Sequence, residues 1–440
     1  MPMLLVANFI MKHPYLIILF SLFAHIATAQ KQQNLQDSVQ VFFNEVKTAA
    51  DKKTKLWNKD VYGSMLFVNP KTRQIYANES DTAGVLEPKG DIYMGVLPKQ
   101  INIANTAINW SGRRWAMVML PLPQNKYDRI NLLAHELFHS VQPSLGFELS
   151  NIDNNHLDLE EGRIYLRLEL EALKKAIQCS SKKELRQHLT NALTFRKYRY
   201  TFYEAASRTE NQLELNEGLA EFTGLTISHR DKNQTKAFFV EGIDNFFRNP
   251  TFVRSFAYYT TPAYGYLLYK KDKNWNKKVD PQTELTNYFI NAFNIQIPTD
   301  LKNVAEKIAT DYNGRLIMEE EKARAEKTKK LIATYKLKFV DQPHFEIQFE
   351  KMNVSFDPRN IVPLEDKGTV YPNIRVTDSW GVLTVENGAL MSPNWDKISI
   401  TNPVDAIDKK IIGDGWIIEL KEGYIVEKDP ASANFKLRKK

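Results

Sequence analysis

The residues best suited to chemistry lie together in one short stretch, NLLAHELFHSVQP, residues 131–143. His135 and His139 are four positions apart, a spacing that places both imidazoles on one face of a helix. Such a pair can bind a tetrahedral zinc ion that has one more protein ligand and one open position. Glu136 follows the first histidine, where it can take a proton from water and pass it to a leaving amine. The stretch therefore predicts a Zn²⁺ site with Glu136 as general base.

A third ligand is expected from LELNEGLAEFTG, residues 213–224. Glu217 and Glu221 lie one helical turn apart, so that one carboxylate can bind the ion while the other orients a ligand histidine.

Rival ligands lie closer to His139 along the chain. Glu160 and Glu161 are the main alternatives, although carboxylates in the first turn of a helix also favour its dipole. His156 and Asp158 are further alternatives.

The two motifs, HELFH and LNEGLA, resemble those of the gluzincin metallopeptidases, especially the aminopeptidase-N-like and thermolysin-like families. The resemblance implies that His135, His139 and Glu217 bind zinc and that Glu136 is the general base. It also implies that Glu221 replaces a family carboxylate that hydrogen-bonds the first histidine. The resemblance covers only these two helices and the strand before them.

The chain departs from the family pattern in three ways. The gap between His139 and Glu217 is longer than usual, which implies a helical insertion over residues 144–209. Position 221 holds glutamate where aspartate is common. The alanine-methionine-glutamate-asparagine run that binds the substrate terminus in the aminopeptidases is missing, which argues against a standard aminopeptidase.

Two further stretches are candidates for contact with a substrate. In zincins, a strand placed like RRWAMVMLPLP, residues 113–123, often forms the sheet edge that holds substrate by β-addition. The tyrosine-rich run at 256–270 is placed where gluzincins supply an oxyanion donor. Tyr264 is the expected donor because Pro262 and Gly265 suggest a turn, and Tyr259 is the alternative. A core-packed aromatic face is the competing interpretation.

Three arginines fall on the expected inserted helices, namely Arg163, Arg196 and Arg199. Arginine can bind a substrate carboxylate or phosphate through two parallel hydrogen bonds. We favour ion pairs with helix glutamates such as Glu169 or Glu204.

The hydrophobic periodicity predicts an α+β fold. Helices are expected over 35–57, 125–142, 157–178, 182–206 and 210–228, with short strands between 65 and 123. The charged segment 318–330 is expected to be an exposed helix with i,i+4 ion pairs. We therefore expect a zincin-like, mainly helical domain with a small N-terminal sheet over residues 30–335. A β-rich sandwich or barrel is expected over 336–440.

The N-terminal segment resembles a secretory signal peptide. Basic Lys12 precedes an apolar run that ends in Ala27-Thr28-Ala29, so cleavage after Ala29 is expected, with an uncleaved anchor as the alternative. The mature chain would then be periplasmic or secreted, with no stable membrane insertion. Only one cysteine is present, which excludes an internal disulfide.

The charge pattern does not favour nucleic acid as a partner. The formal net charge is +7, and acidic and basic residues are interleaved with no basic stripe that carries aromatics. We therefore expect an exported zinc metallopeptidase acting on peptides or proteins, with no indication of its oligomeric state. The alternatives are a non-catalytic zincin-like binding or scaffold protein and a zinc amidase acting on cell-wall peptides.

Overall fold

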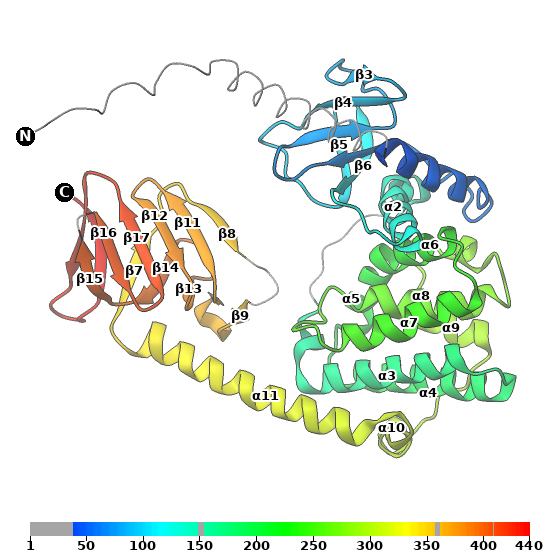
Figure 1. Cartoon of the computed structure of the whole chain (residues 1–440). Helices are drawn as coiled ribbons and strands as arrows, with labels where there is room; N and C mark the ends of the chain where they lie inside the picture. The colour runs from blue at the N-terminus through cyan, green and yellow to red at the C-terminus, as the bar shows by residue number, and fades with distance from the viewer. Residues whose placement is uncertain (1–37, 148–153, 357–360, 408) are drawn as a thin grey trace, which may run out of the picture.

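The computed structural model describes residues 38–147, 154–356, 361–407 and 409–440. The expected signal peptide, residues 1–29, lies outside them. The fold is α+β, with a small sheet and a helical body followed by a β-rich C-terminal region (Figure 1). None of the described helices combines the length and the apolar composition that a membrane crossing requires.

The N-terminal sheet has the strand order β3-β4-β2-β1-β6-β5. Its strands are β1 (Met65–Val68), β2 (Gln74–Ala77), β3 (Glu87–Lys89), β4 (Ile92–Val96), β5 (Thr106–Trp110) and β6 (Arg113–Met119). Strands β1 and β2 form the expected hairpin. Residues 38–51 are helical and lie inside the range expected from periodicity.

Strand β5, and not β6, forms one edge of this sheet, and β3 forms the other. Ser111 and Gly112 both have positive φ, at 49° and 76°, and this tight turn folds β5 back along β6. Strand β6 is therefore enclosed between β1 and β5. The expectation that residues 113–123 supply the sheet edge is wrong.

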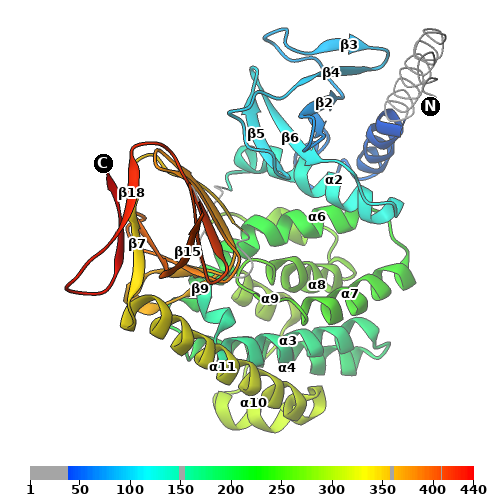
Figure 2. The ribbon, with the colours of Figure 1, turned by 60° about the vertical axis from the view of Figure 1, so that its left-hand side comes forward.

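The motif helix α2 (Lys126–Val141) follows β6. The Asn125 side chain accepts hydrogen bonds from the backbone N–H groups of Tyr127 and Asp128, which caps the helix. Helix α2 lies between the sheet and helix α6 (Leu219–Ile227), as both ribbon views show (Figures 1 and 2). Apolar residues face these neighbours, and the helix is buried on more than one side.

The helical body follows α2 in the chain. It contains η1 (Gln142–Leu145), η2 (Asn155–Asp158), α3 (Glu160–Gln178), α4 (Lys182–Tyr200), α5 (Ala206–Leu213), η3 (Glu214–Gly218), α7 (Lys232–Phe246), α8 (Ala257–Tyr269), η4 (Trp275–Lys278), α9 (Leu285–Phe293), α10 (Leu301–Ala309) and η5 (Thr310–Tyr312). Helices α3 and α4 pack against each other, and α6 packs against both α2 and α8.

The segment expected as one helix over 210–228 has a π-helical turn inside it. Helix α5 runs into η3, a turn with i→i+5 hydrogen bonds, and η3 runs into α6. Glu217 lies within η3, and Glu221 lies in the first turn of α6.

Helix α11 (Gly314–Lys336) leads from the helical body to the C-terminal region. Residues 318–330 are helical and mostly exposed, as expected, but Glu321 is only 2% exposed. Its carboxylate accepts hydrogen bonds from Arg163 at 2.6 Å and Arg167 at 2.7 Å. These ion pairs attach α11 to α3.

The C-terminal region consists of two sheets, with orders β18-β19-β7-β14-β13-β10-β9 and β15-β16-β17-β12-β11-β8. Its elements are η6 (Leu337–Asp341), β7 (His344–Gln348), β8 (Asn353–Phe356), β9 (Val362–Pro363), η7 (Glu365–Lys367), β10 (Thr369–Tyr371), β11 (Ile374–Asp378), β12 (Gly381–Val385), β13 (Ala389–Met391), β14 (Lys397–Thr401), β15 (Pro403–Ile407), β16 (Lys410–Gly413), β17 (Trp416–Leu420), β18 (Tyr424–Lys428) and β19 (Phe435–Lys439). Buried side chains from both sheets form one hydrophobic cluster, as in a β-sandwich.

Candidate metal centre

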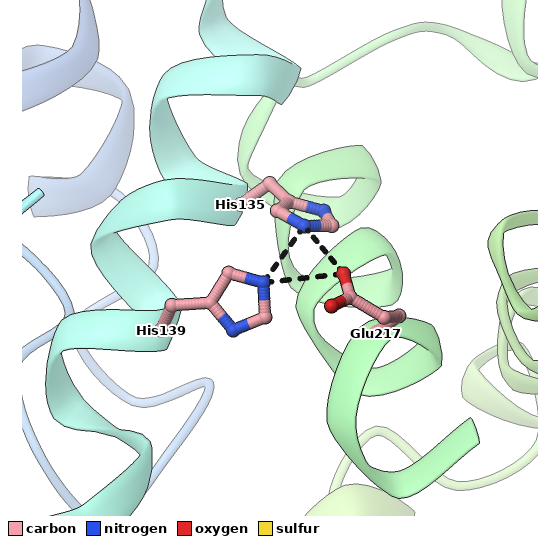
Figure 3. Close-up of side chains that lie close together, drawn as sticks. All are labelled: His135, His139 and Glu217. Atoms are coloured by element: carbon pink, nitrogen blue, oxygen red, sulfur yellow. Dashed lines mark hydrogen bonds and ion pairs between the residues drawn. The ribbon is translucent and has the colours of Figure 1, made fainter. Parts of the chain in front are cut away.

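Three potential ligand atoms converge between α2 and η3 (Figure 3). The Nε2 atoms of His135 and His139 are 3.0 Å apart, and each is 3.3 Å from Oε2 of Glu217. Both histidines are buried, and Glu217 is partly exposed. Helix α2 supplies the two imidazoles on consecutive turns, while the π-helical turn supplies the carboxylate.

The spacing of these atoms fits a tetrahedral ion. Two donors bound at the usual zinc distances of about 2.0–2.2 Å lie roughly 3.3–3.6 Å apart. The two distances to Glu217 reach this range, and the distance between the imidazoles is slightly shorter. Two imidazoles and one carboxylate are also one of the ligand sets found in catalytic zinc sites, where the fourth coordination position stays open. The residues present therefore fit zinc.

The far side of His135 is held by a carboxylate. Its Nδ1 lies 3.0 Å from Oε2 of Glu221, and Oε1 of Glu221 accepts a hydrogen bond of 2.7 Å from Asn131. Because an ionised carboxylate only accepts, the Nδ1 atom of His135 carries the proton. In the neutral ring, the Nε2 lone pair then faces the centre. Glu221 therefore lies where the sequence analysis placed it.

The far side of His139 is held by Gln142, which the sequence analysis did not identify. The Gln142 amide nitrogen donates to the carbonyls of Leu215 at 3.2 Å and Asn216 at 2.8 Å. Its oxygen must therefore accept the 2.7 Å hydrogen bond from Nδ1 of His139. The Nε2 atom of His139 is then also free to bind metal. Gln142 joins the end of α2 directly to the π-helical turn.

Glu136 lies beside His135, His139 and Glu217 and is buried. Its Oε2 atom has no hydrogen-bond partner among the described residues. Burial raises the pKa of this carboxyl group, and the neighbouring His135 and His139 act in the opposite direction. A buried carboxylate oxygen without a partner can accept a proton from a water or a substrate group that enters the site.

Tyr258 is a second residue of the site that the sequence analysis did not identify. Its hydroxyl donates a 2.7 Å hydrogen bond to Oε2 of Glu217, and its ring stacks on His135 at 5.3 Å between centroids. Burial and the Glu217 carboxylate raise the pKa of Tyr258, so the hydroxyl keeps its proton. It remains a donor at neutral pH.

The expected oxyanion donor, Tyr264, is not at the centre. Its hydroxyl donates to Glu169 at 3.0 Å, and its ring is fully buried against Phe289. Pro262 and Gly265 lie inside the continuous helix α8 and form no turn there. Tyr259 packs against Phe246. The helix presents Tyr258 to Glu217 instead.

The rival ligands also have other roles in the structure. The His156 Nε2 atom lies 2.8 Å from Glu210, and Asp158 pairs with Arg163 at 3.3 Å. Glu160 and Glu161 lie in the first turn of α3. Among the described residues, the group that could hold a metal contains Glu217 as its carboxylate and none of these rivals.

The centre is rich in negative charge. Burial opposes protonation of His135, but its contacts with Glu217 and Glu221 and the nearby Glu136 raise its pKa to about 10. Burial likewise opposes ionisation of Glu217, while its contacts with the His135 and His139 imidazoles lower its pKa. Positive charge at this position is therefore electrostatically favourable.

The three arginines form ion pairs, as favoured from the sequence. Arg196 and Arg199 both bind Glu169, at 2.7 and 2.9 Å, whereas Arg163 binds Glu321 and not a glutamate of the inserted helices. No ion pair is found between these arginines and Glu204 within the described part of the chain.

Comparisons with known proteins give no relative for this chain. No protein-family model matches it, and neither the curated proteins nor the solved structures contain a significant match.

Proposed function

We propose that this chain is a zinc-dependent hydrolase of peptide bonds with a gluzincin-like centre. The observation that carries the proposal is the convergence of His135, His139 and Glu217 at the spacing of tetrahedral ligands. A carboxylate with a free buried oxygen, Glu136, lies beside them. Zinc bound there would polarise a substrate carbonyl and make water a nucleophile at neutral pH.

The protein groups around the ligands have separate roles. Glu136 takes a proton at Oε2 from the attacking water and delivers it to the leaving amine. Glu221 and Gln142 hold Nδ1 of the two histidines, so that each Nε2 stays directed to the centre. Tyr258 holds Oε2 of Glu217 and keeps a hydroxyl proton beside the reacting groups.

The sheet offers a place for an extended substrate. Strand β5 forms one edge of the N-terminal sheet, and both β5 and β6 contact α2. A peptide that added to this edge would gain backbone hydrogen bonds and would lie close to the motif helix. This geometry favours a peptide or protein substrate.

The proposal is tested by the hydrolysis of a mixed library of quenched fluorogenic peptides. Glu136→Gln preserves the size of the side chain but removes the base, so we expect the rate to fall about 10²–10⁴-fold. The zinc content should be unchanged. Glu161→Gln, at an exposed position in the first turn of α3, is the matched control and should keep the parent rate.

Removing the metal with a chelator should also abolish cleavage, and added zinc should restore it. Cleavage that survives chelation, or a Glu136→Gln variant as fast as the parent, would contradict the proposal.

A further inference from the structure

A cluster of buried charges lies between the helical body and the segment that carries Glu217. It contains Glu169 on α3, Arg196 and Arg199 on α4, Glu210 on α5 and Glu214 on η3, and all five are buried. Burying charges is costly unless each is paired and hydrogen-bonded. The cluster therefore requires a fixed arrangement of these helices.

Arg196 makes a three-point contact in this cluster. Its Nε donates to Glu169 at 2.7 Å, while Nη1 and Nη2 donate to the two carboxylate oxygens of Glu214 at 2.9 and 2.8 Å. Glu214 begins the π-helical turn in which Glu217 lies. The bidentate contact therefore fixes this turn from the side of α4.

Glu214 is also bound from the side of α8. The hydroxyl of Thr260 donates to its Oε1 at 2.5 Å. Thr260 lies two residues after Tyr258, whose hydroxyl donates to Glu217. Glu214 and Glu217 are thus each bound to α8, and only Glu214 is bound to Arg196.

The π-helical turn needs such support because i→i+5 turns are rare and occur where the surroundings favour them. The turn is also closely packed against α8, since a Cβ at Gly218 would lie 2.6 Å from the Thr261 side chain. Gln142 binds the carbonyls of Leu215 and Asn216. Arg196 supplies the charged contact among these restraints.

We propose that Arg196 is a positioning residue for Glu217: through Glu214 it holds the π-helical turn so that the Glu217 carboxylate meets His135 and His139. The link to metal binding rests on the proposed function. The link to the position of Glu217 rests on the contacts alone.

Arg199 provides a matched control within the same cluster. It is equally buried and also binds Glu169, at 2.9 Å. Its bidentate partner is Glu210, at 2.9 and 2.6 Å, which lies in α5 and outside the π-helical turn. Loss of its contacts should loosen the cluster without releasing Glu217 directly.

The test compares Arg196→Lys with Arg199→Lys in the full chain. Lysine keeps the charge but cannot supply the planar donors that bind two carboxylates at once. Glu214→Gln serves as a milder variant if Arg196→Lys does not fold, as judged by circular dichroism. Two quantities are measured, namely hydrogen exchange of the amides in residues 213–219 without metal, and titration with cobalt(II).

We expect faster exchange over residues 213–219 in Arg196→Lys and Glu214→Gln, and parent-like exchange there in Arg199→Lys. The cobalt dissociation constant should rise about tenfold or more in the first two variants, as for other groups that orient metal ligands. Their visible cobalt spectrum should change, because it reports the geometry of the ligands. Arg199→Lys should retain both the affinity and the spectrum.

Parent-like exchange in Arg196→Lys, or equal effects in both arginine variants, would overturn the proposal. A parent chain that binds no cobalt would refute the metal centre, and the exchange data would still decide whether Arg196 positions the turn. If the parent chain binds cobalt but cleaves no peptide, the proposed hydrolase activity is refuted. Hydrogen exchange and cobalt titration would still test the role of Arg196.

Discussion

At the scale of the residue, the centre depends on which nitrogen of each histidine carries a proton. Glu221 accepts from His135 and Gln142 accepts from His139, so both rings direct Nε2 inward. Gln142 has the more restricted geometry, because its amide nitrogen is already bound to two carbonyls of the segment that leads to Glu217. One side chain therefore sets the tautomer of His139 and joins the two ligand segments.

Replacing Gln142 by leucine should weaken zinc binding while leaving the three ligands in place. Leucine fills much of the space but leaves Nδ1 of His139 without an acceptor, so the zinc dissociation constant should rise about 10–100-fold. Competition with a chromophoric chelator measures this constant. Gln187→Leu, which removes a hydrogen bond to Asn191 on α4, is the control and should bind zinc like the parent. Equal affinity in Gln142→Leu would show that this contact does not orient His139.

At the scale of the element, the centre depends on how closely α2 and α6 approach each other. A Cβ at Gly224 would lie only 2.4 Å from the backbone oxygen of Asn131, one turn before His135. The glycine therefore allows the close approach through which Glu221 reaches His135. Glycine lowers the stability of a helix relative to alanine, but here it allows the two helices to pack closely.

Gly224→Ala should destabilise the protein, although alanine is the better helix former by about 1 kcal/mol. The backbone contact would force α6 away from α2, and overpacking of this kind costs about 1–3 kcal/mol. Unfolding in urea measures the change in free energy. Gly63→Ala, where a Cβ would meet nothing within 4 Å, should be near neutral. A stabilised Gly224→Ala variant would show that the helices separate without cost.

Periodicity was sufficient to predict the helix that carries His135 and His139, because α2 has a clear apolar pattern and its cap residue precedes it. The pair His135 and His139 follows from helix spacing alone. The π-helical turn could not be predicted, since its wider hydrogen bonding depends on contacts from α4 and α8 that are distant in sequence. The sequence analysis favoured Tyr264, with Tyr259 as the alternative, whereas the structure places Tyr258 beside Glu217. The rotation of α8 is set by packing, and Pro262 does not break the helix.

At the scale of the whole molecule, the hydrophobic cores of the described residues fall into two sets. One set joins the N-terminal sheet and the helical body, and the other lies in the β-sandwich. A smaller cluster places Tyr335 and Phe339 against Leu364, Val370 and Leu390 at the base of the sandwich. The end of α11 and η6 therefore belong with the C-terminal core.

A fragment of residues 330–440 should fold without the rest of the chain. It contains the complete sandwich core and the helical residues that cover its base. We expect a β-type circular dichroism spectrum and a single cooperative thermal transition. A shorter fragment, 344–440, lacks the aromatic cover and should unfold at a lower temperature. A disordered 330–440 fragment would show that the sandwich needs the helical body.

The central claim is the metal centre, and its most direct test is the zinc content of the purified chain, prepared without a histidine tag. The account predicts about one zinc per chain, measured by mass spectrometry of metals, with a marked loss in Glu217→Ala and retention in the control Glu161→Gln. No zinc in the parent chain after reconstitution, or full zinc content in Glu217→Ala, would contradict it.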